Sequence, residues 1–163
     1  MLLITGSAGF IGSSLVKSLI NIHKIIGIDD MSTGHKDNIL VHNNYKFIKG
    51  DCGNLNILNS LKNIKVIIHL AGQSSGEKSF EEPLNDFNRN VQSTINLLDY
   101  SKKIKCKHFI YASSMSVYGE SKKKNVSEND LLEPTSCYGV SKLSSENYLR
   151  IFSKKINYVI FRM

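Results

Sequence analysis

Residues 5–12 read Thr5-Gly6-Ser7-Ala8-Gly9-Phe10-Ile11-Gly12 and continue a short apolar run over residues 2–5. The run predicts a buried strand, and residues 10–20, with apolar side chains at helical intervals, predict a helix. A glycine-rich turn between a strand and a helix is the context in which this spacing binds a dinucleotide. The stretch therefore predicts the first unit of an α/β fold.

The three glycines of this stretch have different predicted tasks. Gly6 permits the tight turn, Gly9 lets the backbone approach a pyrophosphate, and Gly12 lets the helix pack closely on the strand. The pyrophosphate would meet free N–H groups and the positive end of the helix dipole. The alternative is that these glycines only punctuate a turn.

The rest of the chain alternates short apolar runs with helical patterns. Further strands are predicted at residues 25–28, 45–48, 66–70, 108–112 and 158–161, and further helices at 54–61, 83–100 and 136–152. Residues 73–77 are predicted to form a loop. Strands joined by helical crossovers indicate a Rossmann-like, doubly wound parallel sheet of about six strands in the order 3-2-1-4-5-6, with helices on both faces. We expect residues 1–163 to form one cofactor-binding domain.

Composition places the chain among ordinary globular proteins, with 41% hydrophobic and 21% charged residues. The net charge of +7 raises the question of nucleic acid, but the lysines are dispersed and the run Lys122-Lys123-Lys124 lacks interleaved aromatic residues. We therefore expect no nucleic-acid partner. No apolar run has membrane-spanning length, and the first residues do not resemble a signal peptide. A cytoplasmic location is the resulting expectation.

The number and spacing of the cysteines also fit a cytoplasmic protein. Cys52, Cys106 and Cys137 lie far apart, without CxxC or His-paired spacing. Such a set fits reduced thiols better than disulfides or a zinc site, so we predict no metal. Cys137 has no base in the sequence that would make it a nucleophile.

The second predicted strand ends at an acidic residue, Asp29, 23 positions after Gly6. A carboxylate there can accept both hydroxyls of a ribose and would repel a 2′-phosphate, which favours NAD over NADP. Asp30 stands next to it, and the sequence does not decide whether the two share this role. A capping or turn aspartate is the alternative.

Tyr138 and Lys142 are four residues apart and share one face of a predicted helix. A free tyrosine has a pKa of about 10, which is too high for a base at neutral pH. A fixed ammonium nearby, together with the positive nicotinamide ring, favours the phenolate. Ser114 follows a predicted strand upstream and can bond a substrate oxygen. A surface aromatic and a solvated lysine are the alternative.

These motifs resemble the extended short-chain dehydrogenase/reductase superfamily, in its NAD-dependent nucleotide-sugar epimerase/dehydratase branch. The resemblance covers essentially the whole chain. It rests on the glycine turn, Asp29-Asp30-Met31-Ser32-Thr33-Gly34, Gly50-Asp51-Cys52, His69-Leu70-Ala71-Gly72, Asn90-Val91, the run from Ser113 to Gly119, and Tyr138-x-x-x-Lys142.

The resemblance implies a role for each motif in binding NAD. It implies that the pyrophosphate is bound by backbone donors of Phe10 and Ile11, the adenosine ribose by Asp29, Asp30, Ser32, Thr33 and Gly34, adenine by Asp51 and Cys52, and the nicotinamide ribose from beneath by Leu70, Ala71 and Gly72.

It also implies the reactive groups. Tyr138 resembles the catalytic acid/base, Lys142 the residue that holds the ribose and lowers the pKa of the phenol, and Ser114 the hydroxyl partner of the substrate. His69 is expected to be a structural hydrogen-bonding residue, and Glu77 a solvated loop acid.

The two residues after Ser114 distinguish between dehydratases and epimerases within this branch. Dehydratases of this superfamily typically carry an Asp-Glu pair there, whereas this chain has Met115 and Ser116, so 4-epimerisation of a nucleotide-sugar is favoured. Ser74 and Arg89 depart from the galactose-type epimerases, which often carry lysine and asparagine there.

Relatives of this kind are about twice as long and add a carboxy-terminal substrate domain, which we expect to be absent here. A non-catalytic NAD-binding module and a reductase with the same triad stay open. Relatives often dimerise through the helices that bear Asn90 and Tyr138, and the oligomeric state stays open too.

Overall fold

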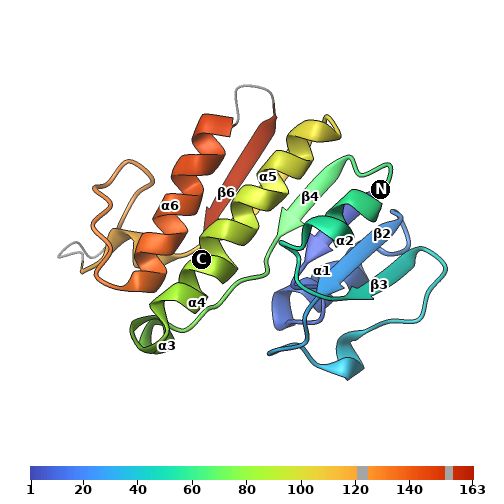
Figure 1. The fold of residues 1–163 in the computed structure, drawn as a ribbon, viewed down its shortest axis with the longest axis horizontal. Coiled ribbons are helices and arrows are strands. Elements are labelled where there is room, and N and C mark those ends of the chain that lie inside the picture. Colours follow the sequence, from blue (N-terminus) through green and yellow to red (C-terminus); the bar gives the residue numbers. More distant parts are fainter. Residues whose placement is uncertain (121–124, 153–155) are drawn as a thin grey trace.

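The computed structural model describes residues 1–120, 125–152 and 156–163. Within them, six parallel strands form one sheet in the order β3-β2-β1-β4-β5-β6 (Figure 1). The strands are β1 (Leu2–Thr5), β2 (Ile25–Asp29), β3 (Tyr45–Lys49), β4 (Val66–His69), β5 (His108–Ser113) and β6 (Asn157–Arg162). This confirms the predicted doubly wound order. The order reverses between β1 and β4, where such folds bind ligands at the carboxyl ends of the strands.

The sheet buries apolar side chains on both faces, which is why its strands read as continuous apolar runs. The main helices are α1 (Phe10–Leu19), α2 (Leu55–Ser60), α5 (Ser93–Lys103) and α6 (Cys137–Phe152). Leu3 and Ile67 face a core that includes side chains of α2, α5 and α6. Ile4 and Ile68 face a second core, to which α1 contributes. Helices therefore cover both faces, as predicted.

The second face is less completely covered toward β6. Val159 and Phe161 pair with Ile110 and Ala112 of β5 on this face and are 47% and 54% exposed. Among the helices that the structure describes, α1 alone contributes to the second core. An apolar strip along β6 is consequently open to solvent.

The predicted helix over residues 83–100 is interrupted in the structure. α4 (Pro83–Phe87) leads into the π-helical turn η2 (Asn88–Gln92), which continues as α5. The hydroxyls of Ser93 and Thr94 donate to the carbonyls of Arg89 and Asn90, both at 2.6 Å. Such back-bonding side chains compete with the regular helical ladder, and π turns of this kind often lie at functional sites.

A short helix, α3 (Gly76–Glu81), replaces part of the loop predicted over residues 73–77. Ser75 caps it, because its hydroxyl accepts a 3.2 Å hydrogen bond from the N–H of Lys78. The apolar pattern over these residues was too weak to reveal the helix. Glu77 lies in its first turn and is exposed.

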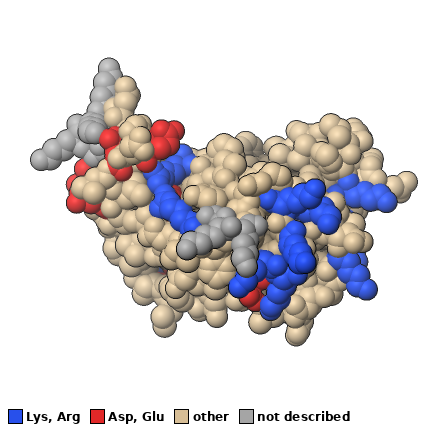
Figure 2. Space-filling view, turned by 90° about the horizontal axis from the view of Figure 1, so that it is seen from above, with Lys and Arg blue, Asp and Glu red and all other residues tan. Residues whose placement is uncertain are grey.

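Positive charge gathers at the edge of the sheet where the strands begin, which Figure 2 views from above. The last turn of α5 and the turns before β4 and β5 carry exposed lysines: Lys62, Lys65, Lys102, Lys103, Lys105 and Lys107. The run Lys122-Lys123-Lys124 lies outside the described residues. None of the helices in the described part of the chain is long and apolar enough to span a membrane.

Candidate functional site

The glycine turn packs tightly against the end of β4. Gly6 has φ +70°, and a side-chain carbon on it would lie 2.8 Å from the backbone nitrogen of Ala71. A side-chain carbon on Gly12 would lie 2.0 Å from the carbonyl oxygen of Gly6. The structure confirms the tight turn at Gly6 and the close packing at Gly12, because neither contact leaves room for a methyl group.

A cleft of ≈ 310 Å³ opens beside this turn, at the carboxyl ends of the central strands. Most of the predicted cofactor-binding residues line it: Gly6, Gly9, Phe10, Ile11, Gly12, Asp29, Asp30, Ser32, Thr33, Asp51, Cys52, Leu70, Ala71 and Gly72. Gly34, Tyr138 and Lys142 are not among its lining residues. Arg89, Ser74, Ala112 and Met163 line it without having been predicted to do so.

Asp29 organises one wall of the cleft. Its carboxylate accepts hydrogen bonds of 2.9 Å from the N–H groups of Ala8 and Met31, one on each oxygen. Gly34 packs against the same carboxylate. Met31, whose N–H makes one of these bonds, adopts a left-handed conformation with φ 66°. The acid therefore joins the glycine turn to the loop after β2.

Asp30 has different partners from those of Asp29. One of its oxygens accepts hydrogen bonds from the backbone and hydroxyl of Ser32, at 2.9 and 2.6 Å. The other forms an ion pair with Arg89 of η2. Asp29 and Asp30 therefore make different contacts, and the sequence alone did not show whether they share one role.

Asp51 and Cys52, which follow β3, also line the cleft. Asp51 accepts a 2.8 Å hydrogen bond from the N–H of Gly53. Cys52 is buried, and burial raises the pKa of its thiol to about 12. The thiol is therefore neutral at physiological pH and offers an apolar surface.

Lys142 is buried beside the opposite end of the cleft. Its Nζ donates a 2.9 Å hydrogen bond to the carbonyl of Ala112, a lining residue, and lies 5.0 Å from the centre of the Tyr111 ring. A side-chain carbon on Gly72 would lie 3.6 Å from the same Nζ. Burial lowers the pKa of Lys142 to about 8, although the charge of Asp86 opposes the shift. The ammonium thus lies within a few ångströms of two lining residues.

Tyr138 lies next to Lys142 as the helical spacing predicted, with Nζ 5.7 Å from the ring centre. Burial raises the pKa of Tyr138, a hydrogen bond with Ser114 opposes this rise, and the charge of Asp86 adds to it. We expected Lys142 to lower this pKa; in the chain by itself, burial dominates instead. The structure nonetheless brings together the three side chains that were predicted to react.

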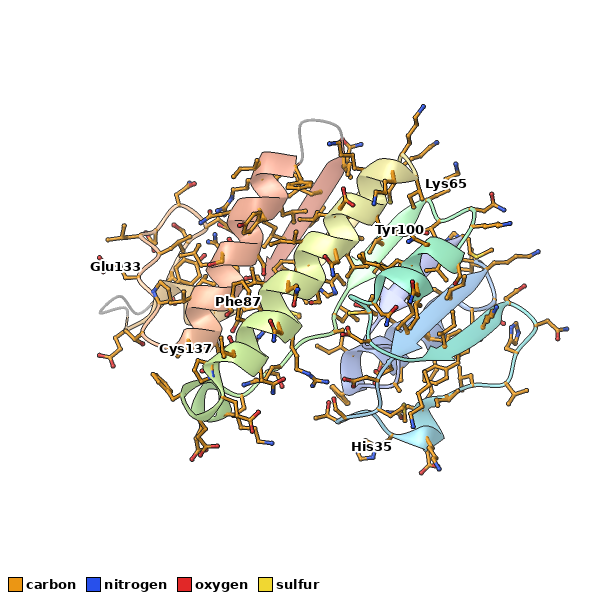
Figure 3. The ribbon with its side chains drawn as sticks, viewed as in Figure 1. His35, Lys65, Phe87, Tyr100, Glu133 and Cys137 are labelled. Atoms are coloured by element: carbon orange, nitrogen blue, oxygen red, sulfur yellow. The ribbon has the colours of Figure 1, made fainter. Side chains whose placement is uncertain are left out.

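Asp86 and Asn90 were not predicted as part of the site. The start of α6 at Cys137 lies beside the end of α4 at Phe87 (Figure 3), which brings Asp86 toward Tyr138. Asp86 is fully buried and accepts a 2.9 Å hydrogen bond from the amide of Asn90. Oδ2 of Asp86 and Oδ1 of Asn90 have no hydrogen-bond partner among the described residues. A buried aspartate inside a helix gives no distinctive signal in a single sequence.

His69 bonds two threonines inside the protein. Its Nδ1 lies 2.7 Å from the hydroxyl of Thr5 and its Nε2 lies 3.0 Å from that of Thr94. Burial lowers the pKa of His69 to about 3, so the ring is neutral. This confirms its expected structural role. The described residues contain no group of three or more His, Cys, Asp and Glu that could hold a metal ion.

The cleft has the features that a dinucleotide requires. The close contacts at Gly6 and Gly12 bring bare backbone to one wall. Among the described residues no side chain caps the start of α1 there, so its first N–H groups suit a pyrophosphate. Asp29 lies at the end of β2, where a ribose is bound in such folds. The residues present therefore fit a dinucleotide cofactor.

Comparisons with known proteins agree with this assignment. The model of the NAD-dependent epimerase/dehydratase family matches residues 2–163. A putative UDP-glucose 4-epimerase from Methanocaldococcus jannaschii is 37% identical over 99% of this chain and 54% of its own length. The UDP-glucose 4-epimerase of Mycolicibacterium smegmatis is 34% identical over 92% of this chain and 50% of its own.

Solved structures of 4-epimerases also match nearly all of this chain and about half of their own length. UDP-N-acetylglucosamine 4-epimerase from Methanobrevibacter ruminantium, in complex with UDP-N-acetylmuramic acid, superposes with a TM-score of 0.94 at 33% identity, over 99% of this chain and 53% of that one. UDP-glucose 4-epimerase from Brucella ovis, in complex with NAD, gives 0.91 at 28% identity, over 99% and 50%. The chain thus spans about half the length of the relatives it matches.

Proposed function

We propose that this chain, which belongs to the NAD-dependent epimerase/dehydratase family, forms the cofactor-binding part of a nucleotide-sugar 4-epimerase. One observation carries the proposal: Tyr138, Lys142 and Ser114 meet at the end of the cleft marked by Ala112 and Gly72. The family is NAD-dependent, and the cleft fits that cofactor.

The residues divide into a binding set and a reacting set. The glycine turn would hold the pyrophosphate, Asp29 the adenosine ribose, and Asp51 and Cys52 the adenine. Lys142 would hold the nicotinamide ribose, because its ammonium is fixed by Ala112 a short distance from Gly72. We assign residues 1–163 to one NAD-binding domain on the same grounds.

NAD, when bound, supplies an acceptor and donor of hydride. Tyr138 would take the proton from a sugar hydroxyl and return it, and Ser114, which bonds the phenol, would hold the same oxygen. A buried phenol with a raised pKa needs added positive charge to act as a base. Lys142 provides part of that charge beside the ring.

Epimerisation is favoured over dehydration by the residues after Ser114. Met115 is 45% exposed and has no ionisable group, and the hydroxyl of Ser116 is buried. Neither side chain can act as the acid or base that eliminates water. Substrates of the named relatives, which include UDP-glucose, set the class that we propose: a UDP-sugar.

Cofactor binding is tested first, by calorimetric titration with NAD. We expect saturable binding that Asp29→Ala weakens at least about tenfold, equivalent to 1.4 kcal/mol. Asp37→Ala removes an exposed acid that does not line the cleft, and it should bind NAD like the unmodified chain. Circular dichroism of each variant reports on folding. If the unmodified folded chain does not bind NAD, the proposal is refuted.

Turnover is tested next, with UDP-glucose and UDP-N-acetylglucosamine as probes and NMR as the readout. Conversion to the 4-epimers that Tyr138→Phe abolishes, with NAD binding retained, supports an epimerase. NAD binding without conversion favours a non-catalytic module, and net oxidation of the sugar, with accumulation of reduced nicotinamide, favours a reductase/dehydrogenase that works here in the oxidative direction. Either outcome contradicts epimerase activity for this chain.

We infer two further properties of this chain, its oligomeric state and its location. A homodimer would use α4 and α6, where Leu84, Phe87, Val140 and Ile151 are exposed. A cytoplasmic location accords with three unpaired thiols, at Cys52, Cys106 and Cys137. Light scattering during gel filtration tests the first, since Leu84→Glu should turn a dimer into a monomer.

A further inference from the structure

We propose that Asp30 sets the cofactor selectivity of the cleft by holding the guanidinium of Arg89 in an ion pair, which withholds it from a 2′-phosphate. The inference rests on the proposed function, because it concerns which nicotinamide dinucleotide the same cleft accepts. It makes Asp30 and Arg89 specificity residues.

The pair joins two parts of the cleft lining that are distant in the sequence. Asp30 follows β2 and Arg89 belongs to η2, 59 positions later. Arg89 also donates a 3.1 Å hydrogen bond to the hydroxyl of Ser32. All three residues line the cleft, and the two charged side chains are about one-third exposed, at 32% and 33%. The guanidinium therefore lies at the wall where the adenosine ribose is expected.

Arg89 is the only lysine or arginine among the described residues that line the cleft. An arginine near the ribose is the usual ligand of a 2′-phosphate, since its planar fork matches phosphate oxygens. Here Asp30 cancels that charge and occupies part of the fork. Asp29 lies beside it with its carboxylate held toward Ala8 and Met31. A phosphate would thus meet two carboxylates and no available cation.

A purely mechanical role is the competing explanation. In that case the ion pair would only tie the loop after β2 to η2, and breaking it from either side would have the same effect. The selectivity role predicts a difference between the two sides. Loss of Asp30 releases a cation into the cleft, whereas loss of Arg89 removes that cation.

Asp30→Asn separates these explanations. Asparagine keeps the oxygen that accepts from the backbone and hydroxyl of Ser32, so the turn is retained while the charge is lost. Binding of NAD and NADP to the unmodified chain, Asp30→Asn, Arg89→Ala and the double variant is measured by calorimetry. Asp99→Asn is the matched control, because it removes an acid from an exposed ion pair with Lys103, remote from the cleft lining.

We expect Asp30→Asn to bind NADP about tenfold more tightly than the unmodified chain does, with a smaller change for NAD. Arg89→Ala, the double variant and Asp99→Asn should show no gain for NADP. Equal weakening of NAD by Asp30→Asn and Arg89→Ala, without a gain for NADP, overturns the inference in favour of a mechanical tie. A gain that persists in the double variant, or appears in Asp99→Asn, also overturns it. Failure of the unmodified chain to bind NAD refutes the proposed function instead.

Discussion

The carboxylate of Glu146 accepts a 2.6 Å hydrogen bond from the hydroxyl of Ser113, and Glu146 is fully buried. Arg162 of β6 donates to the same carboxylate at 3.0 and 2.8 Å. Ser113 precedes Ser114, and Glu146 lies one helical turn after Lys142. This contact therefore ties α6 to the ends of β5 and β6, where the proposed reacting side chains meet.

We expect Glu146→Gln to lower the free energy of unfolding by about 3 kcal/mol, because Arg162 is left mostly buried without an anionic partner. Burial by itself would raise the pKa of Glu146, but hydrogen bonds from Arg162 and Ser113 lower it below 4.5. The folded state therefore binds the proton less readily than the unfolded state. This contribution is present above pH 4.5 and is lost as the pH falls below it.

Urea unfolding at about pH 7 and about pH 4 measures this difference. The exposed Glu81 supplies the control variant, Glu81→Gln. Destabilisation by Glu146→Gln should shrink at the lower pH, while that of the control stays small throughout. Equal destabilisation at both pH values would show that the charge of Glu146 is not the cause.

The glycine turn offers a steric prediction. A methyl group on Gly12 would lie 2.0 Å from the carbonyl oxygen of Gly6, which is backbone and cannot rotate away. Gly12→Ala should therefore destabilise the chain by more than about 2 kcal/mol and weaken NAD binding. Gly76→Ala is the matched control, since a methyl there meets nothing within 4 Å. Thermal unfolding of both variants measures the difference in their stability. Similar melting temperatures for Gly12→Ala and Gly76→Ala would refute the prediction.

The fold was predictable from sequence because its signals are local. Each strand is an apolar run, and the turn around Gly6 couples the first strand to the first helix within a dozen residues. Most of the cleft lining was expected from the resemblance to a known family, and the carboxyl ends of parallel strands, which meet at one edge of a sheet, bring those residues together. The strand order was predicted from the right-handed crossovers together with the glycine-rich first turn.

The unpredicted parts depend on distant partners. Asp30 and Arg89 are 59 positions apart, and only the assembled sheet brings them together. In the sequence Asp86 resembles a solvated helix acid, but in the fold it is fully buried and its charge acts on Tyr138 of α6. The π turn at Asn90 is accompanied by hydroxyl-to-carbonyl bonds from Ser93 and Thr94, and such bonds also occur in regular helices, so the sequence pattern does not predict the turn.

The neutral imidazole of His69 gives a spectroscopic prediction. Burial lowers its pKa from 6.5 to about 3, so the unfolded state binds the proton first as the pH falls. The resulting stability is present above pH 6.5 and is lost progressively below it. NMR of the ring protons should show no titration of His69 between about pH 5 and about pH 8, with the remaining histidines as internal comparison. A midpoint near the ordinary value would contradict this.

Lys142 should reduce stability while serving the cofactor. Burial lowers its pKa from 10.5 to about 8, so the unfolded state binds more protons between these values and stability rises with pH across them. At about pH 7 the buried charge costs roughly 3 kcal/mol, taking 1.36 kcal/mol per pKa unit. Lys142→Met should therefore be no less stable than the unmodified chain at that pH, yet should bind NAD more weakly.

Urea unfolding at about pH 7 and about pH 9.5 tests this prediction, with exposed Lys17→Met as the control. The unmodified chain should gain stability relative to the Lys142→Met variant at the higher pH, and a constant difference would disprove the buried-charge explanation.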